Sequence, residues 1–199
     1  MLSIKKYKLF FPFIILLFLF SCGKKEDKSI NLDDPATVKN IANKVLSADI
    51  KFSTTGNFTF NKYASIVAGT EFTGKDKWGI SFNLIEKEDG EFKAVYKTDV
   101  LDGSFDKCIV DKIKLSSFGG EMIYYNSKDY FIGSGGGDVY SYIIDFRTKE
   151  IFSAHLTVGR SAYASLALSD NIEDKLIRQF FISYFKKDYP SLRVIQSDN

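Results

Sequence analysis

The chain has little of what common catalytic and metal sites are built from. Its 199 residues include one histidine, His155, two cysteines, Cys22 and Cys108, and one tryptophan. Histidine is the most frequent general base and a common zinc ligand, so Ser-His catalysis, Cys-His catalysis and histidine-rich metal sites all depend on His155. We therefore expect no metal and no cofactor, and we favour a protein that is not an enzyme.

Two further absences concern partners and membranes. The longest wholly apolar run covers the 12 residues 9–20, whereas a membrane-spanning helix needs about 20. A basic surface is also missing, because Lys5, Lys6 and Lys8 precede that run and the chain after residue 21 carries 24 basic against 25 acidic residues. Without a basic field to attract phosphates, we expect no binding to nucleic acid.

The N-terminus has the order of a secretory signal peptide: basic residues, a short apolar run, then a small residue at the cleavage point. Its end, Leu19-Phe20-Ser21-Cys22, resembles the lipobox of bacterial lipoproteins. The resemblance implies that residues 1–21 are removed and that acylated Cys22 attaches the protein to the lipid bilayer. Several acyl chains make such an attachment durable. The alternative is an ordinary signal peptide that happens to end beside a cysteine.

Residues 22–30 are almost wholly polar and predict a flexible tether between the lipid and the domain. Within it, Lys25, Glu26 and Asp27 are similar to the lysine and two acidic residues that mark surface export in some Gram-negative lipoproteins. A solvated linker is the alternative interpretation. We expect an outer-membrane lipoprotein of the cell envelope, on either the periplasmic face or the cell surface.

Residues 31–199 predict a single α+β domain with a helix near each end. Asp34 can cap a helix that has Pro35 in its first turn, and apolar residues recur at helical spacing up to Leu46. Near the C-terminus, Asp170 and Glu173 have the spacing of a capping box. An apolar stripe follows: Ile172, Leu176, Ile177, Phe180, Phe181, Tyr184 and Phe185.

Between the helices, short apolar or alternating runs predict roughly nine antiparallel strands. We expect a curved antiparallel sheet or a partly closed barrel, flanked by the two helices. The clearest hairpin covers residues 84–96, with Asp89 and Gly90 at its turn. Adjacent Tyr124 and Tyr125 should point to opposite faces of one strand, which places one ring toward solvent or under a helix.

A second hairpin, residues 140–158, allows a prediction of register. Tyr140, Tyr142, Ile144 and Phe146 share one face of the first arm, and Phe152, Ala154, Leu156 and Val158 share one face of the second. Pairing Phe146 with Phe152 would put both sets on the same side and leave an odd-length loop. That register would also place Asp145, Ser153 and His155 together on the outward face. These are the residue types of a catalytic triad, but the spacing does not give the required geometry and no nucleophile elbow surrounds Ser153.

Three other groups of residues have a structural and a functional interpretation. The glycine-rich run of residues 132–138 lacks the Lys-Ser/Thr ending of a phosphate-binding loop. It predicts a permissive hairpin connection or a binding rim, formed by Gly133, Gly135, Gly136, Gly137, Tyr140 and Tyr142. Acidic residues 99, 102, 106 and 111 depart from calcium-loop spacing and favour turn and capping roles. Cys108 favours a buried core position, because unpaired cysteine is usually buried.

The functional prediction follows mainly from the predicted localisation in the cell envelope. We expect an anchored envelope lipoprotein that binds an envelope protein or a glycan without catalysis, as inhibitor, immunity or ligand-binding modules of this size do. The alternative is a carboxylate-based hydrolase, such as a glycan-cleaving enzyme, which would need two acidic side chains about 5 to 10 Å apart in one cleft.

The lipobox resemblance is tested by Cys22→Ser. We expect this variant to lose all incorporation of labelled fatty acid and to accumulate as an unprocessed precursor, because the acylated thiol is missing. Metabolic labelling and intact mass measurement report both effects. Normal labelling of the variant would refute the assignment.

Overall fold

The computed structural model describes residues 30–61, 63–74, 78–103, 105–115, 119–131, 135–159 and 163–196. Residues 31–199 form one compact unit. In chain order its elements are α1 (Pro35–Leu46), β1 (Phe52–Gly56), β2 (Ser65–Thr73), β3 (Trp78–Glu88), β4 (Glu91–Lys97), η2 (Phe105–Lys107), β5 (Cys108–Ile113), β6 (Met122–Phe131), β7 (Gly137–Asp145), β8 (Glu150–Val158), β9 (Ala164–Leu168), α2 (Lys175–Lys186) and β10 (Arg193–Gln196).

The strands form two separate sheets. The first has the order β1-β2-β3-β4, and the second has the order β10-β9-β8-β7-β6-β5. All neighbours are antiparallel except β10, which lies parallel to β9. The α+β class with two flanking helices is confirmed, but the expected single curved sheet or partly closed barrel is wrong, and the described residues contain ten strands rather than nine.

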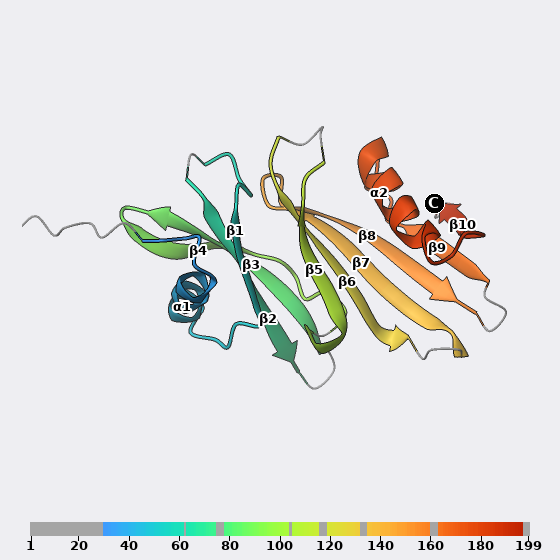
Figure 1. Cartoon of the computed structure of the whole chain (residues 1–199), viewed down its shortest axis with the longest axis horizontal. Helices are drawn as coiled ribbons and strands as arrows, with labels where there is room; N and C mark the ends of the chain where they lie inside the picture. The colour runs from blue at the N-terminus through green and yellow to red at the C-terminus, as the bar shows by residue number, and fades with distance from the viewer. Residues whose placement is uncertain are drawn as a thin grey trace, which may run out of the picture. The chain divides into compact units, whose positions relative to one another are not determined.

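Three apolar clusters show how the layers pack. Val38 and Ala42 of α1 bury one face of the first sheet, while Ile177, Phe181 and Phe185 of α2 bury one face of the second. A third cluster lies between the two sheets and includes Phe82 from the first. The helices therefore lie on the outer faces, α1 against the first sheet and α2 against the second (Figure 1).

The start of α1 agrees with the sequence. The Asp34 carboxylate accepts hydrogen bonds from the backbone N–H groups of Ala36 and Thr37, at 3.3 and 3.0 Å, and Pro35 occupies the first helical position. These bonds satisfy donors that have no partner inside a helix, which is why a capping carboxylate fixes the first turn.

The start of α2 corrects the sequence prediction. Asp174, not Asp170, is its N-cap, and the Asp174 carboxylate accepts from the N–H groups of Leu176 and Ile177 at 2.7 and 3.3 Å. Residue 170 lies one turn too early because the chain after β9 makes a turn of its own, in which the Ile172 N–H donates to the Ser169 carbonyl. The predicted apolar stripe is confirmed from Leu176 onward, with Ile177, Phe181 and Phe185 buried, whereas Ile172 lies before the helix.

The 84–96 hairpin forms as predicted. Glu88 pairs with Glu91 across the two-residue turn, where Asp89 has φ 52° and Gly90 has φ 85°. Positive φ at both central positions is the turn geometry that matches the twist of two antiparallel strands, and Asp-Gly is among the sequences that adopt it most readily.

The predicted register of the β7–β8 hairpin is wrong. Phe152 pairs with Ile143, and Asp145 pairs with Glu150, so four residues rather than an odd number connect the strands. The prediction assumed that only one face of each strand is buried. Both faces of β7 are enclosed, because Tyr142 and Ile144 point between the sheets while Ile143 points toward α2. Phe152 joins Ile143 on the α2 side.

Tyr124 and Tyr125 lie on opposite faces of β6, as expected. The Tyr124 ring packs under α2, with its centroid 5.0 Å from that of Phe180, whereas Tyr125 packs between the sheets against Phe82 at 5.7 Å. Burial raises the pKa of Tyr124 above its ordinary value, because the anionic form would lose hydration. Among the described residues, no helix is long and apolar enough to cross a bilayer.

Docking of α2 is tested by Phe181→Asp. Phe181 is fully buried, so an aspartate there would place an uncompensated carboxylate in the core. We expect the free energy of unfolding to fall by at least about 3 kcal/mol, the usual loss for removing a buried Phe ring. Urea denaturation followed by circular dichroism measures it.

The matched control is Ser183→Asp, at an exposed position on the same helix. It should change stability by less than about 0.5 kcal/mol, as exposed substitutions usually do. Equal stability of the two variants would contradict the docking of α2.

Candidate functional site

The second sheet is wider than the first, and part of its inner face is left uncovered. The cluster between the sheets takes residues from β5, β6 and β7 and reaches β8 only at Ile151. No described residue of β9 or β10 belongs to it. Ile195 of β10 is 41% exposed and Tyr163, just before β9, is 57% exposed. The inner side of β8, β9 and β10, together with the adjoining β7 residues Asp138 and Tyr140, is here called the open face, and it has no complete covering layer within the described chain.

Strand register places the residues of the open face in two rows. One row runs Tyr140, His155, Ala167, Ile195 from β7 to β10, and the other runs Asp138, Thr157, Ser165, Arg193. Both rows point away from α2, because the alternating residues Ala154, Leu156 and Leu166 belong to the cluster under that helix. The open face thus presents aromatic, polar and small side chains.

A hydrogen-bonded group lies at the β7 edge of the open face. His155 Nε2 is 2.7 Å from Asp138 Oδ1, and the Thr157 hydroxyl donates to the same oxygen at 3.0 Å. The imidazole stacks on the Tyr140 ring, with centroids 4.5 Å apart and planes 6° from parallel. The His155 and Asp138 side chains are 41% and 37% exposed. These contacts fix the histidine in one orientation, as expected of a preorganised binding surface.

The glycine-rich run leads directly into this group. Gly136 has φ 89°, and a β-carbon there would collide with the Val158 carbonyl oxygen. Gly137 begins β7 and pairs with Val158, one residue before Asp138. The glycines at 136 and 137 therefore let the chain approach β8 closely and enter β7. Gly135 precedes them and is exposed.

The predicted rim residues differ in burial. Tyr140 is half-buried at the border of the open face, where it stacks on His155 and packs against the cluster between the sheets, whereas Tyr142 is only 8% exposed and belongs to that cluster. The Tyr142 hydroxyl donates to Asp102 Oδ2 at 2.9 Å, and its ring stacks on that of Tyr125. Burial, reinforced by the Asp102 charge, raises the pKa of Tyr142 above its ordinary value. Tyr142 therefore has a structural contact in place of the predicted rim position.

Several predicted residues lie outside the described part of the chain. They are Cys22, Lys25, Glu26, Asp27 and Gly133. Among the others, Cys108 is half-buried, is not part of a disulfide, and has its Sγ 3.5 Å from the Phe105 carbonyl oxygen. Within the described ranges, no group of three histidine, cysteine, aspartate or glutamate side chains is arranged to hold a metal ion.

Asp145, Ser153 and His155, the residue types of a catalytic triad, do not lie on one face of the second sheet. Asp145 shares a face with Ile143, toward α2, whereas Ser153 and His155 lie on the inner side. The Asp145 carboxylate pairs with Arg147 through bonds of 3.0 Å from Nε and 2.8 Å from Nη2. The contacts that His155 makes were missed from the sequence, because Asp138 comes opposite Thr157 only in the true register.

Three cavities lie away from the open face. A groove of about 440 Å³ lies beside α2 and includes Lys114 and Tyr184, and a second of about 450 Å³ includes Leu32 and Tyr63. A smaller cavity of about 90 Å³ lies under α2. Each is lined by at most one acidic residue, so none of the three supplies the carboxylate pair that a glycoside hydrolase needs.

Comparisons of the chain with protein-family models, curated proteins and solved structures find no match.

The Asp145–Arg147 pair gives a prediction for the β7–β8 turn. Its side chains are 1% and 6% exposed, so Asp145→Asn would leave a buried guanidinium without its counter-charge. We expect a loss of about 3–5 kcal/mol of unfolding free energy in urea titrations.

Two variants serve as controls for that loss. Asp111→Asn, at an exposed position on β5, should leave stability within about 0.5 kcal/mol. Adding Arg147→Met to Asp145→Asn should recover part of the loss, because it removes the buried guanidinium that Asp145 neutralises. A loss for Asp145→Asn no greater than for Asp111→Asn would show that the pair does not stabilise the turn.

Proposed function

We propose that this protein is a lipid-anchored protein of the outer membrane that works by binding a partner protein on the open face, without catalysis. Acylated Cys22 supplies the anchor, on the strength of the lipobox resemblance. The observation that carries the binding role is the mismatch between a four-stranded and a six-stranded sheet, which leaves the inner side of β8, β9 and β10 exposed.

The shape of the open face favours a protein as the partner. Small ligands and cofactors bind in concave sites that enclose most of their surface. None of the residues of β9 or β10 lines any of the three cavities. The small side chains of Ala167 and Ser165 at the centre of the open face allow another backbone to come close, while Ile195 and Tyr140 supply apolar contact.

The chemistry of the open face also suits recognition. Arg193 and Tyr163 are joined by a 3.2 Å hydrogen bond from Nη1 to the phenolic oxygen, at the side opposite the His155–Asp138 group. Aromatic, arginine and histidine side chains that are already held in place lose little conformational entropy on binding. Tyrosine and arginine are also the residues enriched at protein interfaces.

The experiment is crosslinking in intact cells, followed by mass spectrometry of the proteins attached to the anchored chain. Ala167→Glu places a charge at the centre of the open face, and Ala94→Glu makes the same change at an exposed position on β4 of the other sheet. We expect one stoichiometric partner that is retained with Ala94→Glu and lost with both Ala167→Glu and Cys22→Ser.

Each other result has a definite meaning. A partner that persists with Ala167→Glu would contradict the open face as its site. Retention of the partner by Cys22→Ser would contradict the need for the anchor. Absence of any protein partner would contradict the proposal and direct attention to a glycan bound near Tyr140 and His155.

A further inference from the structure

The loop between β1 and β2, residues 57–64, displays two aromatic side chains to solvent. Phe60 is 85% exposed and Tyr63 is 65% exposed, the two highest values among the large hydrophobic residues that the structure describes. Large side chains of this kind are normally buried, so a pair of them on one loop marks a contact surface.

The loop is held by contacts at its base. Phe58 is fully buried between the sheets, where its ring packs edge-on against Phe146 with centroids 6.0 Å apart. The Asn57 N–H donates to Glu121 Oε2 at 2.7 Å, and the Thr59 hydroxyl donates to Glu86 Oε1 at 2.6 Å. Phe58 and Thr59 are thus held by contacts with the domain, and Phe60, the next residue, points toward solvent.

A contact with Arg147 also restricts the orientation of the Phe60 ring. The Arg147 guanidinium carbon lies 5.9 Å from the centroid of the Phe60 ring. Arg147 is held by the buried Asp145 carboxylate, so one side of the ring is supported by a fixed cation. Most of the Phe60 side chain nevertheless faces solvent, since 85% of its surface is exposed.

The tether joins the domain beside this loop. Leu32, two residues after the predicted tether, lines the same cavity as Tyr63. The Thr55 hydroxyl near the end of β1 donates to the Leu32 carbonyl at 3.3 Å. Nine residues, 22–30, separate the domain from the anchor and can span at most about 30 Å when fully extended.

We propose that this loop contacts the bilayer through Phe60 and Tyr63, which insert at its surface. This inference rests on the proposed anchoring through Cys22. An anchored chain is never far from lipid, and a displayed Phe and Tyr match the apolar interior and the polar interface of a bilayer. The loop contains Lys62 and no acidic residue, so it carries no charge that lipid phosphates would repel.

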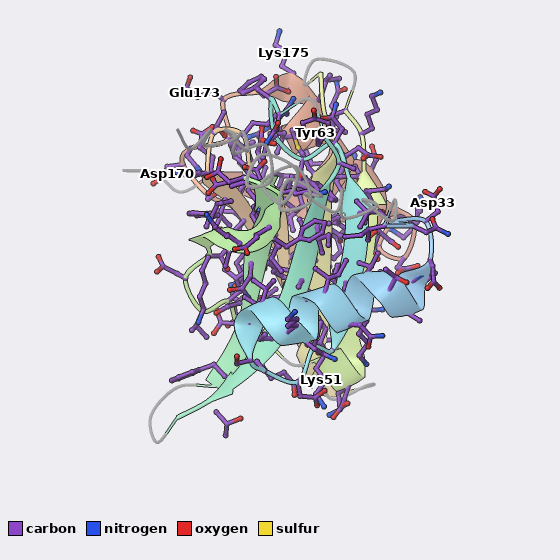
Figure 2. All side chains as sticks on the ribbon, turned by 90° about the vertical axis from the view of Figure 1, so that its left-hand side faces the viewer. Asp33, Lys51, Tyr63, Asp170, Glu173 and Lys175 are labelled. Atoms are coloured by element: carbon purple, nitrogen blue, oxygen red, sulfur yellow. The ribbon has the colours of Figure 1, made fainter. Side chains whose placement is uncertain are left out.

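The contact also fixes which end of the domain faces lipid. Tyr63 lies at the same end as Asp170, Glu173 and Lys175, and Lys51 lies at the other end (Figure 2). Phe72, 45% exposed, lies near the far end of β2, and a nine-residue strand is about 30 Å long. Position 72 should therefore stay in water.

The test uses the acylated full chain in vesicles of phosphatidylethanolamine and phosphatidylcholine, with and without bromine on the acyl chains. Zwitterionic lipids avoid repulsion of Asp170 and Glu173 at the same end. Bromine quenches tryptophan fluorescence at short range. The natural Trp78, whose backbone pairs with Thr73 at the far end of β2, is present in every variant, and the signal of the unsubstituted protein is subtracted as background.

Phe60→Trp is compared with Phe72→Trp, the same substitution at the other end of β2. We expect Phe60→Trp to add a blue-shifted emission that brominated vesicles quench, and Phe72→Trp to add emission that they do not quench. Equal quenching at the two positions, or quenching at neither, in acylated and vesicle-bound protein would overturn the inference and leave the anchor intact.

Failure of the anchor is recognised separately. Intact mass reports the acyl chains, and flotation reports attachment to vesicles. A chain that is neither acylated nor recovered with vesicles would contradict the proposed anchoring, and this inference would fall with it.

Discussion

The structure depends on the need to bury both faces of the second sheet. Its outer face lies under α2 and is filled by residues such as Phe181 and Ile143, and its inner face packs on the first sheet through Tyr125 and Ile144. Apolar burial is the dominant favourable term in folding, so a sheet with two apolar faces must find two partners. The first sheet serves as one of them, and α1 then covers the surface that the first sheet would otherwise expose.

Because the first sheet has two strands fewer, inner burial stops at the start of β8. Apart from Ile195, the residues of the open face are polar, small or in contact with each other, as in the His155–Asp138 pair. The proposed binding role and the proposed membrane contact occupy different ends of this arrangement. Asp138 lies near the start of β7 and Asp145, beside the Phe60 loop, ends it, a separation of about 23 Å along the strand. A partner on the open face and a bilayer at the loop can therefore be bound together.

Helix starts and turns were predictable where the residues that form them act on backbone groups close by in the sequence. Asp34 and Pro35 fix the start of α1, and Asp89 and Gly90 fix the turn between β3 and β4, because each acts on residues within one turn. The start of α2 was placed one turn early, since Asp170 and Asp174 both precede the apolar stripe at plausible distances. Only the fold of the residues after β9 determines which carboxylate reaches the helix.

Non-local features were not predictable in the same way. The β7–β8 register was inferred from one buried face, and a strand enclosed on both sides gives no unique answer from alternation. Consequently the contacts of His155 with Asp138, and the burial of Tyr142 between the sheets, could not be found from the sequence.

The sequence by itself determined the α+β class, the two helices, the clearest hairpin and the residues on which the lipoprotein prediction depends, since these follow from short-range patterns. Only the tertiary structure decided that the strands divide into two sheets, which faces they bury and which face stays open. Those outcomes depend on the relative widths of layers made from distant segments, and no local pattern contains that information.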